Sequence, residues 1–470
     1  MTQSVEMPLW LLLLILGFAA IAALDRMLIP SVRWFFRRRL EKAVSRLNKN
    51  LDRPIQPFKL ARRFDMIQRI IYDPAVAQAV AEHATAQGIP ENVAFEEARR
   101  YAREIVPSFS ASAYFGFAIR AARILSNALY RVRLWHLDEE ALGKIDRDAT
   151  VVFVMNHRSN MDYVLVTYLA AERSALSYAV GEWAQVWPLS RLIRAMGAFF
   201  IRRKSRNELY RKVLSCYVRL ATQAGVTQAM FPEGGLSQSG ALMPAKLGLL
   251  KYIVDAHQMD GRDVVFVPVA LNYDHVLEDR ILISAAKDKK RRFDARIGVI
   301  TGQALHQVWL RITGRYHRFG FAGVSFGAPV SLKQMRSETE GDVSRLLARS
   351  LMRQIGGLTP ILPVPLIAWM MLRTGPLSRI ELERRLNTLL KQIPDTYVHL
   401  PRGSRGYTVE VALRDLTERG IVVEGEGLFS PVAGQEPVLR YYANSIRHLM
   451  PSVPEGDAAV AKEISAPAGS

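Results

Sequence analysis

Short apolar runs alternate with amphipathic stretches along the chain from residue 150 onward. The apolar runs occupy residues 150–155, 175–180, 197–201, 227–231, 264–271 and 323–330. Between the third and fourth of these runs, residues 207–223 have the amphipathic spacing of a helix. Because strands alternate with helices, we expect an α/β layer fold with a largely parallel sheet flanked by helices.

Residues 7–24 form an apolar run of 18 residues without a charge, close to the ~20 that cross a bilayer core. The residues before this run contain no Lys or Arg and include Glu6, unlike the start of a signal peptide. Eleven Lys and Arg residues follow within residues 31–63. We therefore expect a retained anchor in the inner (cytoplasmic) membrane, with the body of the protein in the cytoplasm and the basic block facing anionic phospholipid. A cleaved signal peptide and a helix that only lies on the membrane surface remain alternatives.

Three further segments lie outside the α/β pattern. Residues 40–105 are rich in helix-forming side chains, with turn signals near 54–57 and 88–90. Residues 113–135 are apolar with interleaved basic residues and no acid, which fits either a core helix or a helix on a membrane surface. Residues 354–372 are apolar but carry three prolines, which favours a buried or membrane-surface hairpin over a second span.

The C-terminal third reads as a separate small module. Residues 377–431 contain two helical runs followed by two β-like runs, which suggest a winged-helix-like shape. The predicted organisation is a membrane anchor (1–30), a basic helical region (31–110), the α/β domain (111–335), an apolar Pro-rich connector (336–376), the C-terminal module (377–450) and a disordered tail (451–470).

Composition narrows the possible partners. The formal net charge of +19 and pI of about 10.1 point to anionic partners, such as nucleic acid, a membrane surface or a polyanionic substrate. Nucleic acid is disfavoured because the charge is concentrated beside the expected anchor and no recognition motif is present. The single cysteine, Cys216, is expected to be a buried apolar residue. No HExxH or CxxC spacing indicates a metal site.

Polar residues follow several of the predicted strands, where ligands bind in open α/β sheets. These residues are Asn156-His157, Arg202-Arg203-Lys204, Glu233-Gly234-Gly235 and Asn272-Tyr273-Asp274. A His on the turn and an Asp in the first turn of the next helix can face each other. Asp162 would then hold one ring nitrogen of His157, leaving the other as a general base. The alternative is that Asp162 is an acid favoured by the helix dipole and His157 a surface residue.

Four motifs occur in a fixed order: "NHRSNMDY", "GAFFIRR", "FPEGG" with a following "PAKLG", and "VPVALNYDHVLE". This set resembles the glycerolipid acyltransferase family, and most of all its membrane-bound bacterial glycerol-3-phosphate acyltransferases. The run "VLRYYANSIRHLM" at 438–450 is also typical of that branch. The resemblance covers residues 110–335 well and the C-terminal third loosely.

The resemblance implies transfer of an acyl group from acyl-CoA or acyl-carrier protein to glycerol 3-phosphate, giving lysophosphatidate for phospholipid synthesis, without a cofactor or metal. It assigns His157 as the general base and Asp162 as the residue that orients it. Arg202 and Arg203 would clamp the acceptor phosphate, and Glu233 would bind acceptor hydroxyls or brace its loop. Backbone donors near either turn could stabilise the oxyanion. Acylation of lysophosphatidate or a related acceptor is the alternative.

One loop departs from the family pattern. Related enzymes carry two arginines in the loop after the acid–glycine turn, where this chain has "GLSQSG" with Leu236 and Gln238. The other residues of the expected binding set are Gly234, Gly235, Lys204, Arg206 and Lys246. Either the cations among them, with Arg202 and Arg203, replace the missing arginines, or the acceptor is not glycerol 3-phosphate.

Three alternative hypotheses concern residues in or near these motifs. Residues 191–219 carry nine Lys and Arg, which form either a solvated helix face or a docking surface for acyl-CoA or carrier protein. A serine hydrolase would use Ser159, but the chain has no GxSxG elbow. A catalytically inactive membrane scaffold would leave His157, Asp162 and Glu233 without a role.

Overall fold

The structure is a computed structural model of the 470-residue chain. The structure describes residues 8–10, 12–14, 16–17, 38, 42, 44–49, 51–134, 138–170, 174–181, 185, 189–202, 207–287, 319–394, 400 and 405–451. The chain divides into two compact units, one of residues 1–55 with 172–174 and the other of residues 56–171 with 175–470.

The first unit includes most of the expected membrane anchor. Residues 9–10, 12–14 and 16–17 are helical, and most of the rest of 7–24 lies outside the described residues. Near the end of this unit, the Asn48 side chain accepts a hydrogen bond from the Ile55 backbone N–H at 2.9 Å. Within the described part of the chain, no helix has both the length and the apolar character needed to cross a bilayer. The anchor therefore stays a prediction.

The second unit begins with four helices, as the sequence predicts for this region. They are α2 (Pro57–Leu60), α3 (Arg63–Ile71), α4 (Pro74–Gln87) and α5 (Glu91–Ile105). Asp73 caps α4 by accepting from the Ala75 N–H, and Gly88 ends it with φ +62°. The helices α3, α4 and α5 pack against α10 (Glu208–Gln223), whose N-cap is Asn207.

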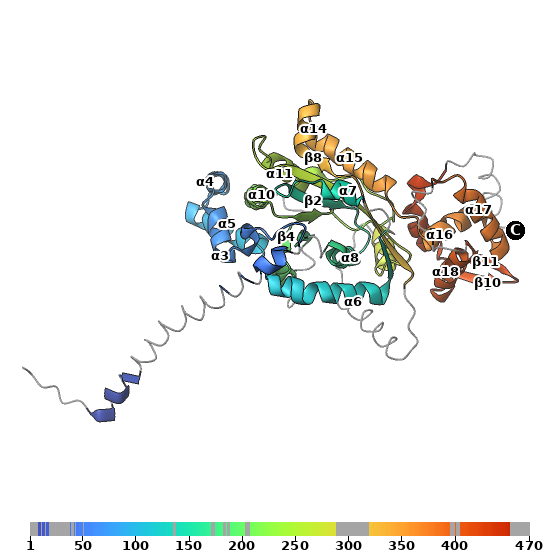
Figure 1. The fold of residues 1–470 in the computed structure, drawn as a ribbon, viewed down its shortest axis with the longest axis horizontal. Helices are drawn as coiled ribbons and strands as arrows, with labels where there is room; N and C mark the ends of the chain where they lie inside the picture. The colour runs from blue at the N-terminus through green and yellow to red at the C-terminus, as the bar shows by residue number, and fades with distance from the viewer. Residues whose placement is uncertain are drawn as a thin grey trace, which may run out of the picture. The chain divides into compact units, whose positions relative to one another are not determined.

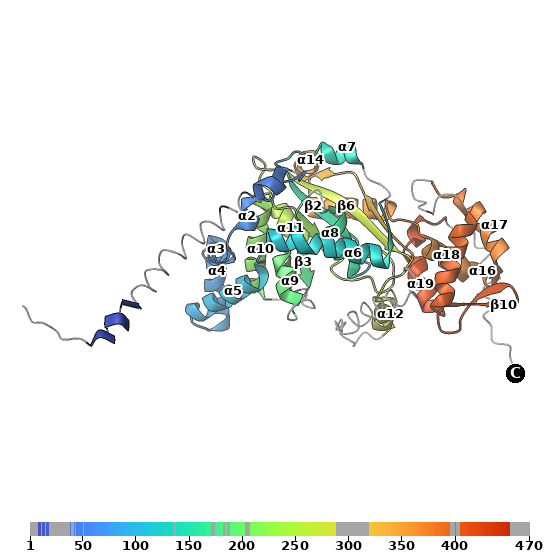
Figure 2. The same ribbon diagram turned by 60° about the horizontal axis from the view of Figure 1, so that its bottom comes forward.

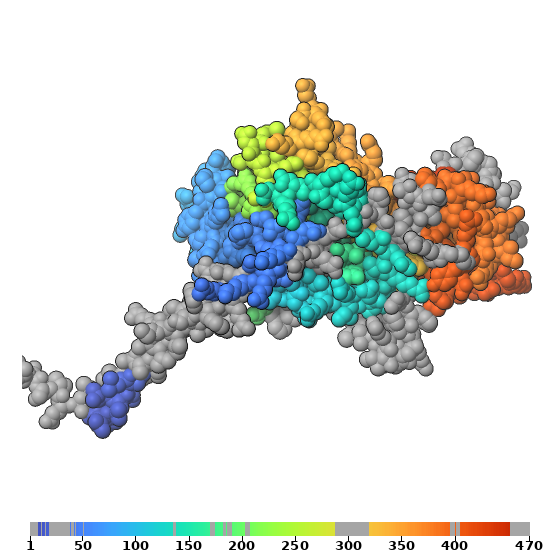
Figure 3. Space-filling model, in the orientation of Figure 1, coloured from blue at the N-terminus to red at the C-terminus, as the bar shows by residue number. Residues whose placement is uncertain are grey.

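The segment at 113–135 is only partly helical. It forms a π-helix η1 (Ser112–Ala118), α6 (Ile119–Leu129) and the strand β1 (Arg131–Leu134). The helix ends at Leu129 because Tyr130 is extended, and β1 then pairs in parallel with β7 (Phe321–Phe326). One face of α6 packs on α8 (Met161–Ala170), while Phe117 of η1 and Ile124 of α6 are 60% and 67% exposed. Figure 3 shows this segment at the molecular surface.

The central sheet has eight strands, and the six apolar runs of the sequence all overlap strands of this sheet. Besides β1 and β7 they are β2 (Thr150–Met155), β3 (Ser177–Gly181), β4 (Phe199–Ile201), β5 (Gln228–Met230), β6 (Val264–Tyr273) and β8 (Val330–Ser331). The order is β1-β7-β6-β2-β5-β3-β4, with β8 also on β6. Strands β2 to β6 are mutually parallel, and β6 pairs antiparallel with β7 and β8. The expectation of a largely parallel sheet is confirmed.

Helices cover both faces of the sheet, and the side chains of β2 alternate between two cores. Val151, Phe153 and Met155 join the core that contains residues of α8 and the C-terminal helices. Val152 and Val154 join the core formed with α10 and α11 (Leu247–Ala256). Figure 1 shows α6 and α8 on one side of the sheet and α10, α11 and α15 (Val343–Gly357) on the other, and Figure 2 is turned so that α6 comes forward. The remaining helices are α7 (Glu139–Gly143), α9 (Leu189–Ala195), α12 (Asp279–Lys287) and α14 (Leu332–Glu338).

The apolar run at 354–372 is buried in protein. It forms the end of α15 and most of α16 (Pro363–Thr374), whose first nine residues are all buried. Pro363 and Pro365 lie in the first turn of α16, where prolines are tolerated. Of the alternatives left by the sequence, the structure shows the buried one.

The C-terminal residues form a second, smaller sheet with helices around it. The strands β9 (Leu377–Ser378), β10 (Val422–Gly425) and β11 (Leu428–Pro431) pair antiparallel in the order β10-β11-β9. The helices are α17 (Arg379–Leu390), α18 (Arg405–Glu418), α19 (Glu436–Asn444) and the 3-10 turn η4 (Arg447–Leu449). Helix α19 packs on α16 and α12, so this region shares a hydrophobic core with the α/β sheet.

Candidate active site

Strand β2 delivers His157 to the carboxyl edge of the sheet. All six residues of β2 are buried between its neighbours β5 and β6. The side-chain amide of Asn156 then continues the ladder: it donates to the Leu271 carbonyl at 2.9 Å and accepts from the Leu271 N–H at 2.7 Å. The Asn156 side chain thus makes the two hydrogen bonds to β6 that a backbone residue would make in the ladder. These bonds fix the position of the chain just before His157.

The predicted histidine–carboxylate pair is present. His157 Nδ1 lies 2.9 Å from Asp162 Oδ2, and the two residues are 1% and 0% exposed. The same Asp162 oxygen accepts from the backbone N–H groups of Arg158 at 2.7 Å and Ser159 at 3.1 Å. With Nδ1 held by the carboxylate, proton transfer with a substrate would fall to Nε2.

Aromatic rings fix the plane of the imidazole. The Phe231 ring stacks on it with a centroid distance of 4.0 Å and an interplanar angle of 22°. The Tyr163 ring meets it edge-on at 5.5 Å. Phe231 directly follows β5 and Tyr163 lies in α8, so one ring comes from each neighbouring element.

The acid–glycine loop lies against the His157 turn. Glu233 accepts from the His157 N–H at 2.9 Å and from the Met243 N–H at 3.1 Å, and the His157 carbonyl accepts from the Ser237 N–H at 3.1 Å. Burial raises the pKa of Glu233 to about 7, against the two N–H donors that lower it. Gly234 has φ +70°, and a Cβ there would lie 2.8 Å from the Lys246 side chain. Glu233 therefore braces the two loops, with Lys246 beside them.

The sequence assigned no role to two supporting residues. Tyr273, at the end of β6, donates its hydroxyl to Asp162 Oδ1 at 2.7 Å. Burial and the Asp162 charge raise the pKa of Tyr273 well above its usual value, which keeps this phenol a donor. Glu278 accepts from the Ser159 hydroxyl at 2.8 Å and from the Asn160 N–H at 3.2 Å. Both residues lie within the motif "VPVALNYDHVLE", and membership of this motif was the only feature of the sequence that could have pointed to them.

Those contacts also bear on the nucleophile alternatives. The Ser159 hydroxyl is oriented toward Glu278 and accepts from the Met161 N–H at 3.1 Å, as a helix-start residue does. Cys216 is buried, and burial raises the pKa of its thiol to about 12, which keeps it protonated. Among the residues that the structure describes, no three His, Cys, Asp or Glu side chains gather as ligands of a metal ion would.

The C-terminal region reaches the same loops. The Arg158 side chain donates to the Gly240 carbonyl, and its guanidinium lies 5.2 Å from the Tyr441 ring centroid. The Asn444 side chain donates to the Ser239 carbonyl at 2.9 Å. Gly240 has φ +80°, and a Cβ there would collide with the Tyr441 carbonyl oxygen. Helix α19 therefore holds the altered loop 235–240 against the residue that follows His157.

Arg202 lies at the same level of the sheet as His157 but three strands away. Phe153, Ala229 and Tyr178 pair across β2, β5 and β3, and β4 continues this register. Three strand spacings of about 4.8 Å place the two positions about 14 Å apart. The Arg202 guanidinium makes a two-pronged pair with Glu104, at 2.9 Å from Nε and 2.5 Å from Nη2. The other members of this predicted cluster, Arg203, Lys204 and Arg206, lie outside the described residues.

Several turn N–H groups are already used within the protein. Those of Arg158 and Ser159 donate to Asp162, that of Gly234 donates to Phe231, and that of Ser237 donates to His157. An oxyanion would need donors other than these four.

Comparisons with known proteins agree with the motif order. The family model described as Acyltransferase matches residues 137–272, and the model of the glycerol-3-phosphate acyltransferase C-terminal region matches residues 310–453. Glycerol-3-phosphate acyltransferases from Aeromonas hydrophila subsp. hydrophila and Shewanella woodyi are 29% and 28% identical, over 84% and 86% of this chain. These alignments cover 51% and 52% of the relatives, so the chain spans about half their length.

A solved structure is also similar to part of the chain. The crystal structure of the 1-acyl-sn-glycerophosphate (LPA) acyltransferase PlsC from Thermotoga maritima matches 52% of this chain and 78% of that chain, with 18% identity and a TM-score of 0.32.

Proposed function

We propose that the chain, which matches both the Acyltransferase family model and the model of the glycerol-3-phosphate acyltransferase C-terminal region, is a glycerol-3-phosphate O-acyltransferase. It would move an acyl chain from acyl-CoA or acyl-carrier protein to glycerol 3-phosphate and release lysophosphatidate. The observation that carries this proposal is the buried His157–Asp162 pair at the carboxyl edge of the sheet, within the matched acyltransferase region.

In the proposed mechanism His157 is the general base. Nε2 takes the proton of the acceptor hydroxyl as its oxygen attacks the thioester carbonyl. A C–O bond forms, the C–S bond breaks, and the proton passes from His157 to the departing sulfur. Asp162 holds the ring through Nδ1 and stabilises the imidazolium, and Tyr273 with the Arg158 and Ser159 N–H groups keeps that carboxylate in place.

Lys246 is the described cation that best fits the acceptor phosphate. Its side chain lies over Gly234, next to the Glu233 that bonds the His157 N–H. Arg202 is about 14 Å from the histidine position, and Glu104 already holds its guanidinium. We infer that Lys246 takes over the role of the arginines missing at 236 and 238. Replacing Lys246 by Gln should raise the KM for glycerol 3-phosphate about tenfold or more and leave that for glycerol unchanged.

Membrane association is a further part of the proposal. The outer face of η1 and α6 exposes Phe117, Ile124 and Leu125 beside Arg120 and Arg123, and residues 107–137 contain no acid. Such a face suits the headgroup region of an anionic phospholipid bilayer. We place the enzyme at the inner membrane, anchored through residues 7–24, with the catalytic domain in the cytoplasm.

The C-terminal module is proposed to act within this chain. Its helices α17 and α18 with the β9–β11 sheet fit the winged-helix-like shape expected from the sequence. The contacts of α19 with loop 235–240 support a bracing role, and nucleic acid is not an expected partner.

The acceptor panel is the decisive experiment. Purified full-length protein would be assayed with labelled acyl-CoA and with glycerol 3-phosphate, 1-acylglycerol 3-phosphate or glycerol. His157→Ala should lower transfer about 10²- to 10⁴-fold. His83→Ala, which removes a partly exposed imidazole paired with Glu97, is the control and should not change it. Full activity of His157→Ala would refute the mechanism, and a preference for 1-acylglycerol 3-phosphate would establish the alternative acceptor.

A further inference from the structure

Four arginines lie near the C-terminal end of α5, where the Glu104 carboxylate pairs with one of them, Arg202. Arg63 at the start of α3 and Arg194 in α9 both donate to the Arg103 carbonyl, Arg194 at 3.3 Å. Arg63 also donates to the Val106 carbonyl at 3.0 Å. We call Arg63, Arg103 and Arg194 the arginine cluster. Together with Arg202 it brings charges from four separate elements to the C-terminal end of α5.

The nearby carboxylate of Glu104 attracts Arg194 but offsets only part of the charge of this cluster. Both carboxylate oxygens of Glu104 accept hydrogen bonds from Arg202, and one of them also accepts from the Gln185 side chain at 3.2 Å. Within the described parts of the chain, no carboxylate lies in ion-pair distance of the three guanidiniums. The pKa of Arg63 is lowered, mainly by burial and then by the positive charges of Arg194 and Arg103. The folded protein thus holds like charges together, at a cost that a bound anion would reduce.

The Arg194 guanidinium is also incompletely hydrogen-bonded. Its Nε is buried without a hydrogen-bond partner in the structure, and its guanidinium lies 4.9 Å from the Phe200 ring centroid. Buried guanidinium nitrogens in proteins normally have acceptors. An oxygen-rich anion on the exposed side of the cluster would offset the shared charge.

We propose that the arginine cluster is a phosphate-binding site, separate from that of the acceptor, and that its ligand is the nucleotide end of the acyl-CoA donor. This inference rests on the proposed function. The cluster lies along β4, three strand spacings or about 14 Å from the catalytic strand. A three-carbon polyol phosphate cannot span that distance while its hydroxyl is at His157. The pantetheine arm of CoA separates the thioester from its phosphates by a far longer chain.

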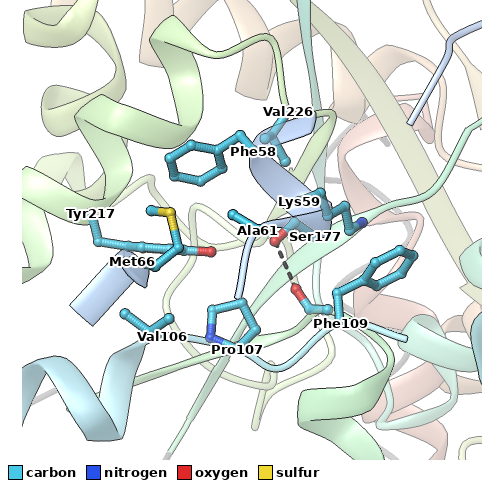
Figure 4. A pocket seen from close by; sticks show the side chains of 11 residues that line it. Phe58, Lys59, Ala61, Met66, Val106, Pro107, Phe109, Ser177, Tyr217 and Val226 are labelled. Atoms are coloured by element: carbon cyan, nitrogen blue, oxygen red, sulfur yellow. Dashed lines mark hydrogen bonds between the residues drawn. The ribbon is translucent and has the colours of Figure 1, made fainter. Parts of the chain in front are cut away.

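The cavity next to the cluster does not hold the ligand. Val106, Pro107 and Phe109 line it together with Phe58 and Lys59, as Figure 4 shows. Its volume is about 20 Å³, which has room for one water. The phosphates would therefore bind on the outer side of the guanidiniums, where the Arg103 side chain is exposed.

A phospholipid headgroup offers the same phosphate chemistry. Leu60, Phe64 and Leu192 are exposed apolar residues close in sequence to Arg63 and Arg194, as expected if this edge touched a bilayer. The nucleotide is favoured because guanidiniums fixed by backbone carbonyls form a shaped site, whereas lipid attraction needs only loose charge. The experiment must separate these two sources.

The test compares two exposed arginines on α5. Arg103→Gln removes a cluster charge without removing a side-chain hydrogen bond that the structure shows, and Arg100→Gln removes a charge paired with Glu97 at 3.4 Å. Full-length proteins would be titrated calorimetrically with CoA and with pantetheine, and KM would be measured for acyl-CoA and the matching acyl-pantetheine. We expect Arg103→Gln to weaken CoA binding about fivefold, and Arg103→Gln/Arg194→Gln about tenfold or more, with pantetheine ligands unaffected.

Each outcome has a distinct meaning. Unchanged CoA affinity in both cluster variants, together with unchanged flotation on vesicles of phosphatidylglycerol, overturns the site. Loss of flotation on those vesicles alone, with phosphatidylcholine vesicles as the control, assigns the phosphate to lipid and overturns the nucleotide assignment. If CoA affinity depends on Arg103 but no acyl transfer to glycerol 3-phosphate is found, the site stands and the proposed function fails.

Discussion

Replacing Tyr273 by Phe tests whether the catalytic carboxylate needs its phenolic partner. Tyr273 is fully buried, and its hydroxyl donates to Asp162 Oδ1 at 2.7 Å. Phenylalanine keeps the ring and removes only this hydrogen bond. A hydrogen bond to a charged group contributes about 1.5–3 kcal/mol. If the bond keeps Asp162 aligned in the transition state, kcat should fall about ten- to hundredfold, because about 1.4 kcal/mol corresponds to one decade.

The KM for both substrates should stay within about twofold of wild type, because Tyr273 acts on Asp162 and not on a substrate. Tyr130→Phe is the matched control: its hydroxyl donates to the uncharged His275 carbonyl at 2.8 Å, and its ring lies 5.3 Å from that of Tyr273. That control should lose about 0.5–1.5 kcal/mol of unfolding free energy and keep its kcat. Steady-state kinetics and urea unfolding of both variants decide the matter. A Tyr273→Phe enzyme with wild-type kcat would refute the reasoning.

Two further changes probe the loops around the pair. Gly240→Ala should unfold or strongly destabilise the protein, because its Cβ would meet the Tyr441 carbonyl at a positive φ; Gly434→Ala, with φ +81° and open space around it, should lose only about 1–2 kcal/mol in thermal unfolding. The pKa of Glu233 is about 7 in the folded protein and 4.5 for an ordinary glutamate, so between these pH values the folded state binds a proton that the unfolded state has released. The free energy of unfolding should therefore fall by up to about 3 kcal/mol as the pH rises from 4.5 to 7. Urea unfolding of Glu233→Gln across that window should show a flatter pH profile, and parallel profiles would contradict this assignment.

The sequence predicted those parts of the site that lie close together along the chain. His157 and Asp162 are five residues apart across a strand–helix turn, so strand periodicity and helix geometry place them together. Tyr273 lies 111 residues from Asp162, and only the pairing of β2 with β6 makes them neighbours. The Arg202–Glu104 pair likewise depends on how α5 packs along β4. Such partners are set by tertiary packing, which a single sequence does not reveal.

Strand and helix limits show the same division. The runs at 150–155 and 264–271 were recognisable because continuous burial gives continuous apolar sequence. Strand β1 was missed because "RVRL" is a half-exposed edge strand that follows an apolar helix without a glycine or proline between them. Its identity comes from pairing with β7, nearly 190 residues later.

The grip of α19 on loop 235–240 has a consequence for how the molecule can be divided. Two family models match separate parts of this chain, residues 137–272 and residues 310–453. The segment between them would be the obvious place to divide the chain into two fragments. Yet Asn444 bonds Ser239, and one hydrophobic core runs from Leu129 to Ile446. A fragment that stops before α19 would expose that core and release the loop beside His157. The two parts should therefore be inherited, expressed and degraded as one cooperative unit.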